Sequence, residues 1–331
     1  MGRAHAPCQP PSQDTIWSVS NALHRFLSTS SWTVRGRVNQ LHEKVDRLTE
    51  AVDNLLDAKK QDEKWRSVFR RQLNAVIRHF YLETDVPAPY GLASQRFRLR
   101  SQNEEDGIIL ALMKAGGAKT RKFVEIGSGS TGGNAATLAA DFGWSGLMVD
   151  ASRKAIEQAK QTFAFNPGVV AVRAMVTPET INELIESNGF AGEIDLLSID
   201  VDSIDYWLLE AVTVCQPRVV IMEYNALFGP SRALSLPNAP KPDNAPKGYS
   251  GASLAAIEKL ARRKGYRLVL CEESGINAFF LRNDIAPAIA GLTVEQAYRP
   301  WMDKHDVTGL RKKNIDIDEV IRQSGLPLTE V

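Results

Sequence analysis

The chain has 331 residues and a formal net charge of +1, with 40 Lys and Arg against 39 Asp and Glu. This balance excludes a strongly basic protein whose main task is to coat nucleic acid. The three cysteines (Cys8, Cys215 and Cys271) are far apart and odd in number, which excludes a disulfide scaffold and indicates a reducing compartment. No stretch approaches the roughly 18 consecutive apolar residues of a membrane-spanning helix, so we expect a cytoplasmic protein that could still contact a membrane peripherally.

The N-terminal part of the chain is predicted to be a helical arm behind a flexible segment. Residues 1–33 are rich in proline and serine and are expected to be flexible. Residues 34–82 are predicted to form one long helix, in which the stretch 38–55 has the three-and-four spacing of a coiled-coil seam. The seam consists of Val38, Leu41, Val45, Leu48, Val52 and Leu55. We therefore expect a homo-oligomer through residues 38–55; the alternative is a helix that folds back onto its own domain.

A basic stretch and a linker follow the seam. Residues 64–82 contain five Lys or Arg and no acidic residue, a pattern that favours a solvated basic face over contact with anionic lipid. Residues 83–94 contain Pro87, Pro89 and Gly91 and are predicted to be a linker.

Strands and helices alternate over residues 95–283, which predicts a single domain. Short apolar runs joined by helical crossovers predict a mainly parallel sheet that is covered on both faces. We expect an α/β, Rossmann-like sheet of seven strands with an antiparallel last strand, followed by a helical tail over 284–331. Predicted strands are 122–126, 146–149, 169–172, 194–199, 219–223, 267–271 and 278–281. Predicted helices are 108–113, with a capping box of Ser101 and Glu104, and 134–142, 154–163, 180–187, 206–215 and 253–264.

A glycine-rich turn follows the first predicted strand. Gly127, Gly129 and Gly132 satisfy the GxGxxG pattern, which lets a backbone approach a nucleotide closely. Asp150 ends the next strand, where a carboxylate can accept hydrogen bonds from ribose hydroxyls. A dinucleotide and S-adenosylmethionine (SAM) can both use this geometry.

Two details favour SAM over NAD(P). Glu125 would repel a pyrophosphate, whereas it can orient the cationic amino-acid end of SAM. The expected antiparallel hairpin is absent from a dinucleotide half-fold. The candidate cofactor-binding residues are Glu125, Gly127, Ser128, Gly129, Asp150 and Ala151, with Met175 and Val176 placed to flank the adenine or simply to pack.

The stretch 101–282 resembles class I SAM-dependent methyltransferases, and within them the FkbM-like family. The resemblance rests on SQNEEDG at 101–107, FVEIGSG at 123–129, DLLSIDVD at 195–202, PRVVIMEYNA at 217–226, YSGASL at 249–254 and GINAFF at 275–280. It implies a seven-stranded sheet and methyl transfer, usually to oxygen, often on sugars, glycans or specialised metabolites. Asp202-Ser203 stands where FkbM-like proteins typically have Glu-Gly, so the resemblance does not carry over a particular acceptor.

Polar side chains follow two neighbouring predicted strands, Asp200 and Asp202 after one and Glu223 and Asn225 after the next. The carboxyl ends of parallel strands meet at one edge of a sheet, so these groups should converge. Oxygen ligands suit Mg²⁺, which can lower the pKa of a substrate hydroxyl, an arrangement similar to the catechol-type O-methyltransferases. We therefore take Asp200, Asp202 and Glu223 as candidate catalytic residues and all four as candidate metal ligands; a metal-free general base and a structural role are the alternatives.

Two further expectations concern the surroundings of this cluster. Asp205 is predicted to cap the helix that it opens, and the Pro- and Gly-rich loop 226–252 is predicted to be a substrate lid. The whole pattern predicts a SAM-dependent O-methyltransferase with a small-molecule or glycan acceptor. The alternatives are a non-catalytic coiled-coil scaffold that retains a methyltransferase-like domain, and an NAD(P)-dependent enzyme.

Overall fold

A computed structural model describes residues 92–96, 98–239, 241–303, 311–312 and 316–331, together with Asp46 and Thr49. The chain divides into two compact units, Met1–Asp62 and Glu63–Val331. The predictions for the flexible segment, the coiled-coil seam and the basic stretch lie outside the described residues, except that Asp46 and Thr49 are helical. All the elements below belong to the second unit.

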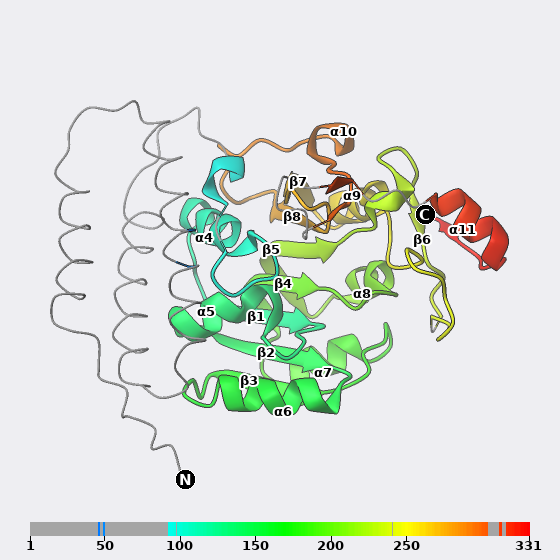
Figure 1. The fold of residues 1–331 in the computed structure, drawn as a ribbon. Coiled ribbons are helices and arrows are strands. Elements are labelled where there is room, and N and C mark those ends of the chain that lie inside the picture. The colour runs from blue at the N-terminus through cyan, green and yellow to red at the C-terminus, as the bar shows by residue number, and fades with distance from the viewer. Residues whose placement is uncertain are drawn as a thin grey trace, which may run out of the picture. The chain divides into compact units, whose positions relative to one another are not determined.

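A seven-stranded sheet forms the centre of this unit, in the order β3-β2-β1-β4-β5-β8-β7 (Figure 1). Its strands are β1 (Lys122–Ile126), β2 (Ser145–Asp150), β3 (Val169–Arg173), β4 (Gly192–Ile199), β5 (Cys215–Glu223), β7 (Tyr266–Cys271) and β8 (Asn277–Arg282). The pairs from β3 to β5 are parallel, and β8 runs antiparallel to both β5 and β7. The predicted fold class, with an antiparallel last strand, is confirmed.

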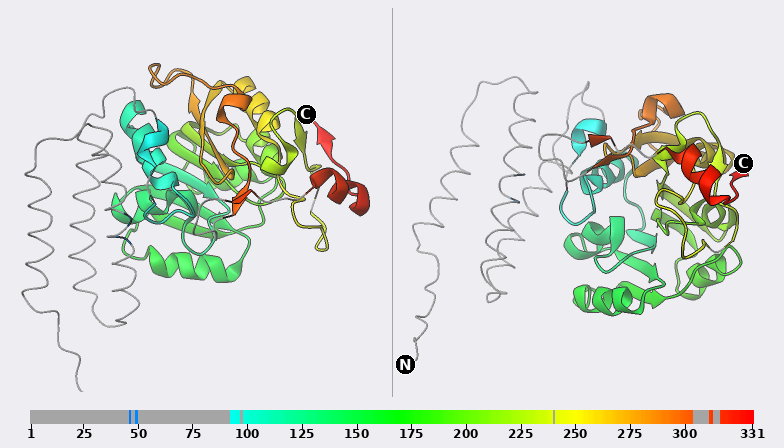
Figure 2. Two further views of the ribbon diagram at one scale, coloured as in Figure 1. Left: turned by 45° about the horizontal axis from the view of Figure 1, so that its top comes forward. Right: turned by 45° about the vertical axis from the view of Figure 1, so that its right-hand side comes forward.

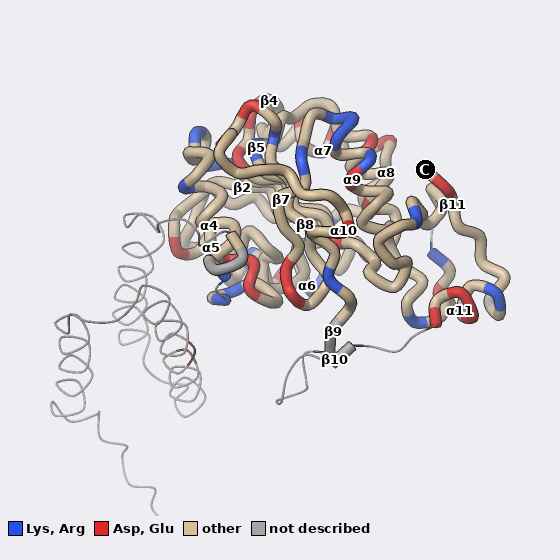
Figure 3. Tube along the Cα trace, turned by 90° about the horizontal axis from the view of Figure 1, so that it is seen from above, with Lys and Arg blue, Asp and Glu red and all other residues tan. Residues whose placement is uncertain are grey.

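Helices cover both faces of the sheet (Figure 2). The last six residues of β4 are buried without alternation, as a strand in the middle of a two-sided α/β fold requires. The helices are α4 (Glu105–Gly116), α5 (Ala136–Asp141), α6 (Arg153–Thr162), α7 (Ile181–Ser187), α8 (Asp205–Ala211), α9 (Leu254–Arg263), α10 (Val294–Ala297) and α11 (Ile317–Ser324), with short 3-10 turns η2 (Leu92–Gln95), η3 (Gly133–Ala135) and η4 (Ala226–Phe228). Acidic and basic residues are interspersed along the described chain (Figure 3).

The C-terminal tail contains more than the predicted helices. Besides α10 and α11, the described part includes the short strands β9 (Met302–Asp303), β10 (Arg311–Lys312) and β11 (Thr329–Glu330). Strand β11 pairs with β6 (Leu234–Ser235), which lies inside the loop 226–252. The Tyr249 hydroxyl of that loop also donates to the carbonyl of Pro327 over 2.6 Å. The tail therefore holds the loop in place.

The predicted helix over 206–215 was too long. Helix α8 ends at Ala211, and Cys215 already pairs with Gly192 in the sheet. The Asn182 side chain accounts for the early end, because its Oδ1 accepts from the backbone N–H groups of Thr213 and Val214 and holds this segment against α7.

The predicted capping box at α4 was wrong. Glu104 occupies the N-cap position and its side chain makes no capping hydrogen bond. The Ser101 hydroxyl instead donates to Asp106 Oδ2 over 2.9 Å, and the same oxygen accepts from the backbone of Leu99 and Arg100. The carboxylate of Asp106, in the first turn of α4, therefore binds the loop that precedes the helix.

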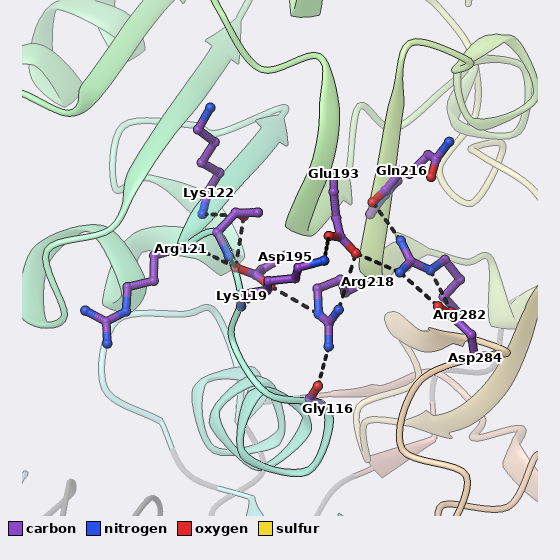
Figure 4. A network of polar contacts seen from close by, with 12 residues as sticks. Gly116, Lys119, Arg121, Lys122, Glu193, Asp195, Gln216, Arg218, Arg282 and Asp284 are labelled. Carbon is purple, nitrogen blue, oxygen red and sulfur yellow. Dashed lines mark hydrogen bonds and ion pairs between the residues drawn. The ribbon is translucent and has the colours of Figure 1, made fainter.

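A polar network centred on the buried Asp195 ties the entry of β1 to β4 at the edge of the sheet where β1 begins (Figure 4). Asp195 is completely buried, and its carboxylate accepts from the backbone N–H groups of Lys119, Thr120 and Arg121 over 2.9, 2.7 and 2.5 Å. It also pairs with Arg218 at 3.3 Å. This one carboxylate therefore fixes the loop from which β1 starts.

Asp195→Ala is expected to lower the free energy of unfolding by about 3–5 kcal/mol, because it leaves three backbone N–H donors without their buried acceptor and removes the buried partner of Arg218, which keeps Glu193 and the Gly116 carbonyl. Asp284→Ala is the matched control. Its side chain is 63% exposed in the pair with Arg282, so its loss should cost about 1 kcal/mol or less. Urea unfolding of both variants measures the difference, and equal losses would contradict the role given to Asp195.

Candidate active site

The candidate site lies where the strand order reverses between β1 and β4, at the carboxyl edge of the sheet (Figure 1). Open α/β sheets bind ligands at such a switch point. The glycine-rich turn leaves β1 here, and the N–H groups of Gly127 and Ser128 both donate to the carbonyl of Val149, over 2.8 and 3.0 Å. The turn is thus fastened to the end of β2.

Two glycines of this turn serve different purposes. Gly127 has φ +88°, and a Cβ there would lie 1.6 Å from the carbonyl oxygen of Asp200, so glycine lets the turn touch the end of β4. Gly129 has φ +57°, and a Cβ there would meet nothing within 4 Å. Gly127 is needed for packing, and Gly129 borders open space in which a ligand could lie against the backbone.

Asp150 ends β2, as predicted, and its carboxylate is part of the turn. Oδ2 accepts from the Gly129 N–H over 2.8 Å, and Oδ1 accepts from the Ser152 N–H over 2.7 Å. Ser128 is buried, whereas Ala151 is exposed. Each carboxylate oxygen keeps a second lone pair that can accept from a ribose hydroxyl. Ribose binding by Asp150 is compatible with these contacts and stays a prediction.

Glu125 lies beneath the turn and is 1% exposed. Its carboxylate accepts from the backbone N–H groups of Asn134 and Ala135 over 3.2 and 2.9 Å, so it anchors η3 and the start of α5. Burial is the main cause that raises the pKa of Glu125 to about 8. In the structure this residue positions the glycine-rich turn; its predicted role toward the amino-acid end of SAM is a separate expectation.

The raised pKa of Glu125 predicts a pH-dependent stability. The unfolded chain releases this proton near pH 4.5, whereas the folded chain keeps it up to about pH 8. The contribution of Glu125 is therefore fully present below pH 4.5 and is lost as the pH rises to about 8, by about 1.4 kcal/mol per pH unit. Urea unfolding at pH 5.5 and 7.5 should show that Glu125→Gln gains stability relative to wild type at the higher pH. A difference between the two proteins that does not change with pH would contradict this.

Met175 and Val176, which follow β3, are placed differently from one another. Val176 is buried in the main core, where it packs as an ordinary core residue. Met175 is 77% exposed. Contact with an adenine ring is therefore sterically open to Met175.

Three of the four predicted metal ligands lie together. One carboxylate oxygen from each of Asp200, Asp202 and Glu223 lies within 4.8 Å of the others. Burial, followed by the charge of Asp205, raises the pKa of Asp200 to about 7, and burial together with the charge of Asp200 raises the pKa of Glu223 well above its usual range. Glu223 Oε2 is buried and has no hydrogen-bond partner among the described residues. The donor set fits a divalent cation that prefers oxygen.

The side chain of Asn225, the fourth predicted ligand, is hydrogen-bonded to the backbone of the loop 226–252. Its Nδ2 donates to the carbonyls of Gly248 and Ser250 over 2.7 and 2.9 Å, and its Oδ1 accepts from the Leu227 N–H over 3.0 Å. The side chain fixes both ends of the loop. A metal-ligand role for Asn225 would have to use the remaining lone pair of Oδ1.

The predicted helix cap at Asp205 was wrong. Asp205 is the first residue of α8, not its N-cap, and its buried carboxylate accepts from the backbone of Val201 and Ser203 over 2.7 and 2.9 Å. These bonds shape the loop after β4, in which Asp202 adopts φ +60°. Lys241 of the loop 226–252 reaches this point as well, because its Nζ donates to the carbonyl of Asp202 at 3.5 Å.

Two buried polar residues at this edge were not singled out from the sequence as site residues. Glu105 opens α4 and Asn277 opens β8, and Asn277 Nδ2 donates to Glu105 Oε1 over 2.9 Å. Both belong to segments quoted above for the family resemblance. The available signal was a polar residue at the first position of a helix, and another directly before the apolar run of β8.

No protein-family model and no curated protein matches the chain. Similar solved structures include an O-methyltransferase from Bacillus cereus in complex with S-adenosylhomocysteine (SAH), with 17% identity, 70% of this chain and 96% of that chain covered, and a TM-score of 0.35. A SAM-dependent methyltransferase from Clostridium acetobutylicum has 14% identity, 64% and 98% coverage and a TM-score of 0.35. A TehB-like SAM-dependent methyltransferase from Corynebacterium glutamicum has 13% identity, with 52% of this chain and 85% of that chain covered, and a TM-score of 0.31.

The strand order itself defines the fold. Five parallel strands, with the glycine-rich turn at the reversal between β1 and β4, are completed by the antiparallel β8 inserted between β5 and β7. The helices found in the described part of the chain are all too short or too polar to cross a membrane. The chain has the α/β, Rossmann-like fold of SAM-dependent methyltransferases.

Proposed function

We propose that the chain is a SAM-dependent methyltransferase that acts on a hydroxyl oxygen. The observation that carries the proposal is the glycine-rich turn at the switch point, bonded to Asp150, in a sheet that ends with the antiparallel β8. A dinucleotide fold has its six strands in the order 3-2-1-4-5-6 without this hairpin. SAM is therefore favoured over NAD(P), which remains a rival, as does a non-catalytic scaffold.

The carboxylates at the ends of β4 and β5 supply the acceptor half of the proposed site. Asp200, Asp202 and Glu223 would hold Mg²⁺, and the buried Glu223 Oε2 without a partner is the feature that fits it best. A bound Mg²⁺ would lower the pKa of the acceptor hydroxyl. The same acidic edge favours the positive sulfonium of SAM.

The chain's own residues would act mainly by positioning. The turn around Gly129 and Asp150 holds the methyl donor, and the anchored loop 226–252 covers the acceptor side. The acceptor oxygen attacks the methyl carbon in line, the C–S bond breaks, and neutral SAH leaves while the hydroxyl proton passes to the carboxylate of Asp200. In the site without a bound cation, where burial raises the pKa of Asp200 to about 7, this carboxylate can hold the proton near neutral pH.

The finer parts of the proposal rest on the sequence. The FkbM-like resemblance favours a sugar, glycan or specialised-metabolite hydroxyl as acceptor. The seam over residues 38–55 favours a homo-oligomer.

Transfer of labelled methyl groups from SAM to a panel of sugars, glycans and phenols tests the activity. We expect at least one hydroxyl acceptor to be methylated, EDTA to abolish the transfer, and Mg²⁺ to restore it. Turnover that is insensitive to EDTA would remove the metal and leave Asp200 as a metal-free base. A folded protein that binds SAH but methylates nothing in the panel would shift the proposal to another acceptor class.

A further inference from the structure

A second buried polar side chain lies directly beside Glu223. Asn277 is 1% exposed and is paired with Glu223 in the antiparallel ladder of β5 and β8. The Tyr224 N–H donates to the Ile276 carbonyl over 2.8 Å, so the neighbouring pair of Glu223 and Asn277 is a non-hydrogen-bonded one. In such a pair the Cα atoms are about 4.5 Å apart and both side chains project from the same face.

The orientation of the Asn277 amide follows from its contact with Glu105. Glu105 is completely buried, and its Oε2 accepts from the Asn103 N–H over 2.7 Å. Its Oε1 accepts from Asn277 Nδ2 over 2.9 Å. A carboxylate accepts hydrogen bonds, so the nitrogen of the Asn277 amide must face Glu105 and its oxygen must point elsewhere.

Two buried acceptor oxygens therefore remain on adjacent strands. Asn277 Oδ1 and Glu223 Oε2 both lack a hydrogen-bond partner among the described residues. Leaving buried polar atoms unpaired is costly. A single cation can satisfy both oxygens, and the combination of carboxylate and amide oxygens is the one that Mg²⁺, Mn²⁺ and Ca²⁺ take.

We propose that Asn277 supplies a fourth oxygen to a divalent-cation site formed with Asp200, Asp202 and Glu223, and that Glu105 positions the Asn277 amide. This rests on the metal part of the proposed function. It gives Asn277 the place that the sequence suggested for Asn225, whose amide is already used by the loop 226–252. The neutral amide adds an oxygen ligand without adding a further negative charge.

Mn²⁺ is the probe, because the signal of free Mn²⁺ in electron paramagnetic resonance gives a dissociation constant without any acceptor. We expect Asn277→Ala to weaken Mn²⁺ binding at least tenfold and to leave SAH binding unchanged. Glu105→Ala should weaken Mn²⁺ binding about tenfold, as for residues that orient metal ligands. Asn182→Ala, which removes a structural asparagine between α7 and the start of β5, is the matched control and should bind Mn²⁺ like wild type.

A double variant keeps the test valid if Asn277→Ala folds poorly. In Glu105→Gln combined with Asn277→Asp, the new amide can donate to the new carboxylate, so this contact survives with its polarity reversed. Asn103 Nδ2, which donates to the same Glu105 oxygen over 3.0 Å, can be replaced by Asn103 Oδ1 when that amide turns over. This variant should bind Mn²⁺ at least as tightly as wild type. Thermal unfolding and SAH titration show which variants are folded.

The possible outcomes are distinct. The inference alone is overturned if folded Asn277→Ala binds Mn²⁺ as tightly as wild type. It is also overturned if the double variant is folded but no longer binds Mn²⁺, or if Asn225→Ala, and not Asn277→Ala, loses Mn²⁺ binding. A wild-type protein that binds SAH but not Mn²⁺ overturns the inference together with the metal part of the proposed function. A wild-type protein that binds neither overturns the proposed function itself.

Discussion

Asp200→Asn is expected to lower methyl transfer roughly 10³-fold while the affinity for SAH stays close to that of wild type. The side chain belongs to the acidic cluster, whereas the contact with the glycine-rich turn is made by the backbone of Asp200, through its carbonyl beside Gly127 and its N–H to Ile126 at 2.9 Å. The substitution therefore removes a proton acceptor, and one negative charge from the candidate metal site, without disturbing the cofactor half of the site.

The control for this variant is Asp318→Asn on α11. The carboxylate of Asp318 is 70% exposed and pairs with Arg232 on the surface, so its loss should leave both transfer and SAH binding unchanged. Methyl transfer with an acceptor from the panel and calorimetry with SAH measure the two quantities. If Asp200→Asn turned over within tenfold of wild type, the role of Asp200 as the base could not stand.

Gly127→Ala is expected to destabilise the fold by about 3–5 kcal/mol, because a Cβ collides with the Asp200 carbonyl and the residue has positive φ. Gly129→Ala shares the positive φ but meets no atom, so it should cost only about 1–2 kcal/mol. The two substitutions are chemically identical and lie in one turn, which makes each the control for the other.

Urea unfolding and SAH titration together separate the roles of the two glycines. Gly127→Ala should lose stability and, with it, SAH binding. Gly129→Ala should stay folded and bind SAH more weakly, since the new methyl group enters the space where the ligand lies against the backbone. Equal stability losses in the two variants would show that the approach of the turn to β4 is not tight.

The strands were predictable because a strand that is buried on both faces consists of consecutive apolar residues. The run around Ile194–Ile199 is buried on both faces and could only be a central strand. The boundary between α8 and β5 was missed because it depends on Asn182, a side chain of another helix that binds the backbone of Thr213 and Val214. The capping box failed in the same way, since the Asp106 carboxylate competes for the loop that Ser101 and Glu104 would have capped.

At the site, too, the order of the strands predicts which residues come together, whereas it does not predict their hydrogen-bond partners. Chain order alone places Asp200, Asp202 and Glu223 at one edge of the sheet, where the structure brings them together. The amide of Asn225 is taken up by loop carbonyls that lie more than twenty positions further along the chain. Asn277 comes beside Glu223 only because β8 inserts antiparallel next to β5. The partners of Asn225 depend on how the loop folds back, and the place of Asn277 depends on the register of β8, and spacing in the sequence specifies neither.

Calorimetric titration of the full chain with SAH, and separately with NAD⁺, tests the central claim most directly. We expect saturable binding of one SAH per chain and no heat from NAD⁺. A folded protein that gives no heat with SAH, or that binds NAD⁺ in its place, would contradict the assignment of the glycine-rich turn to SAM.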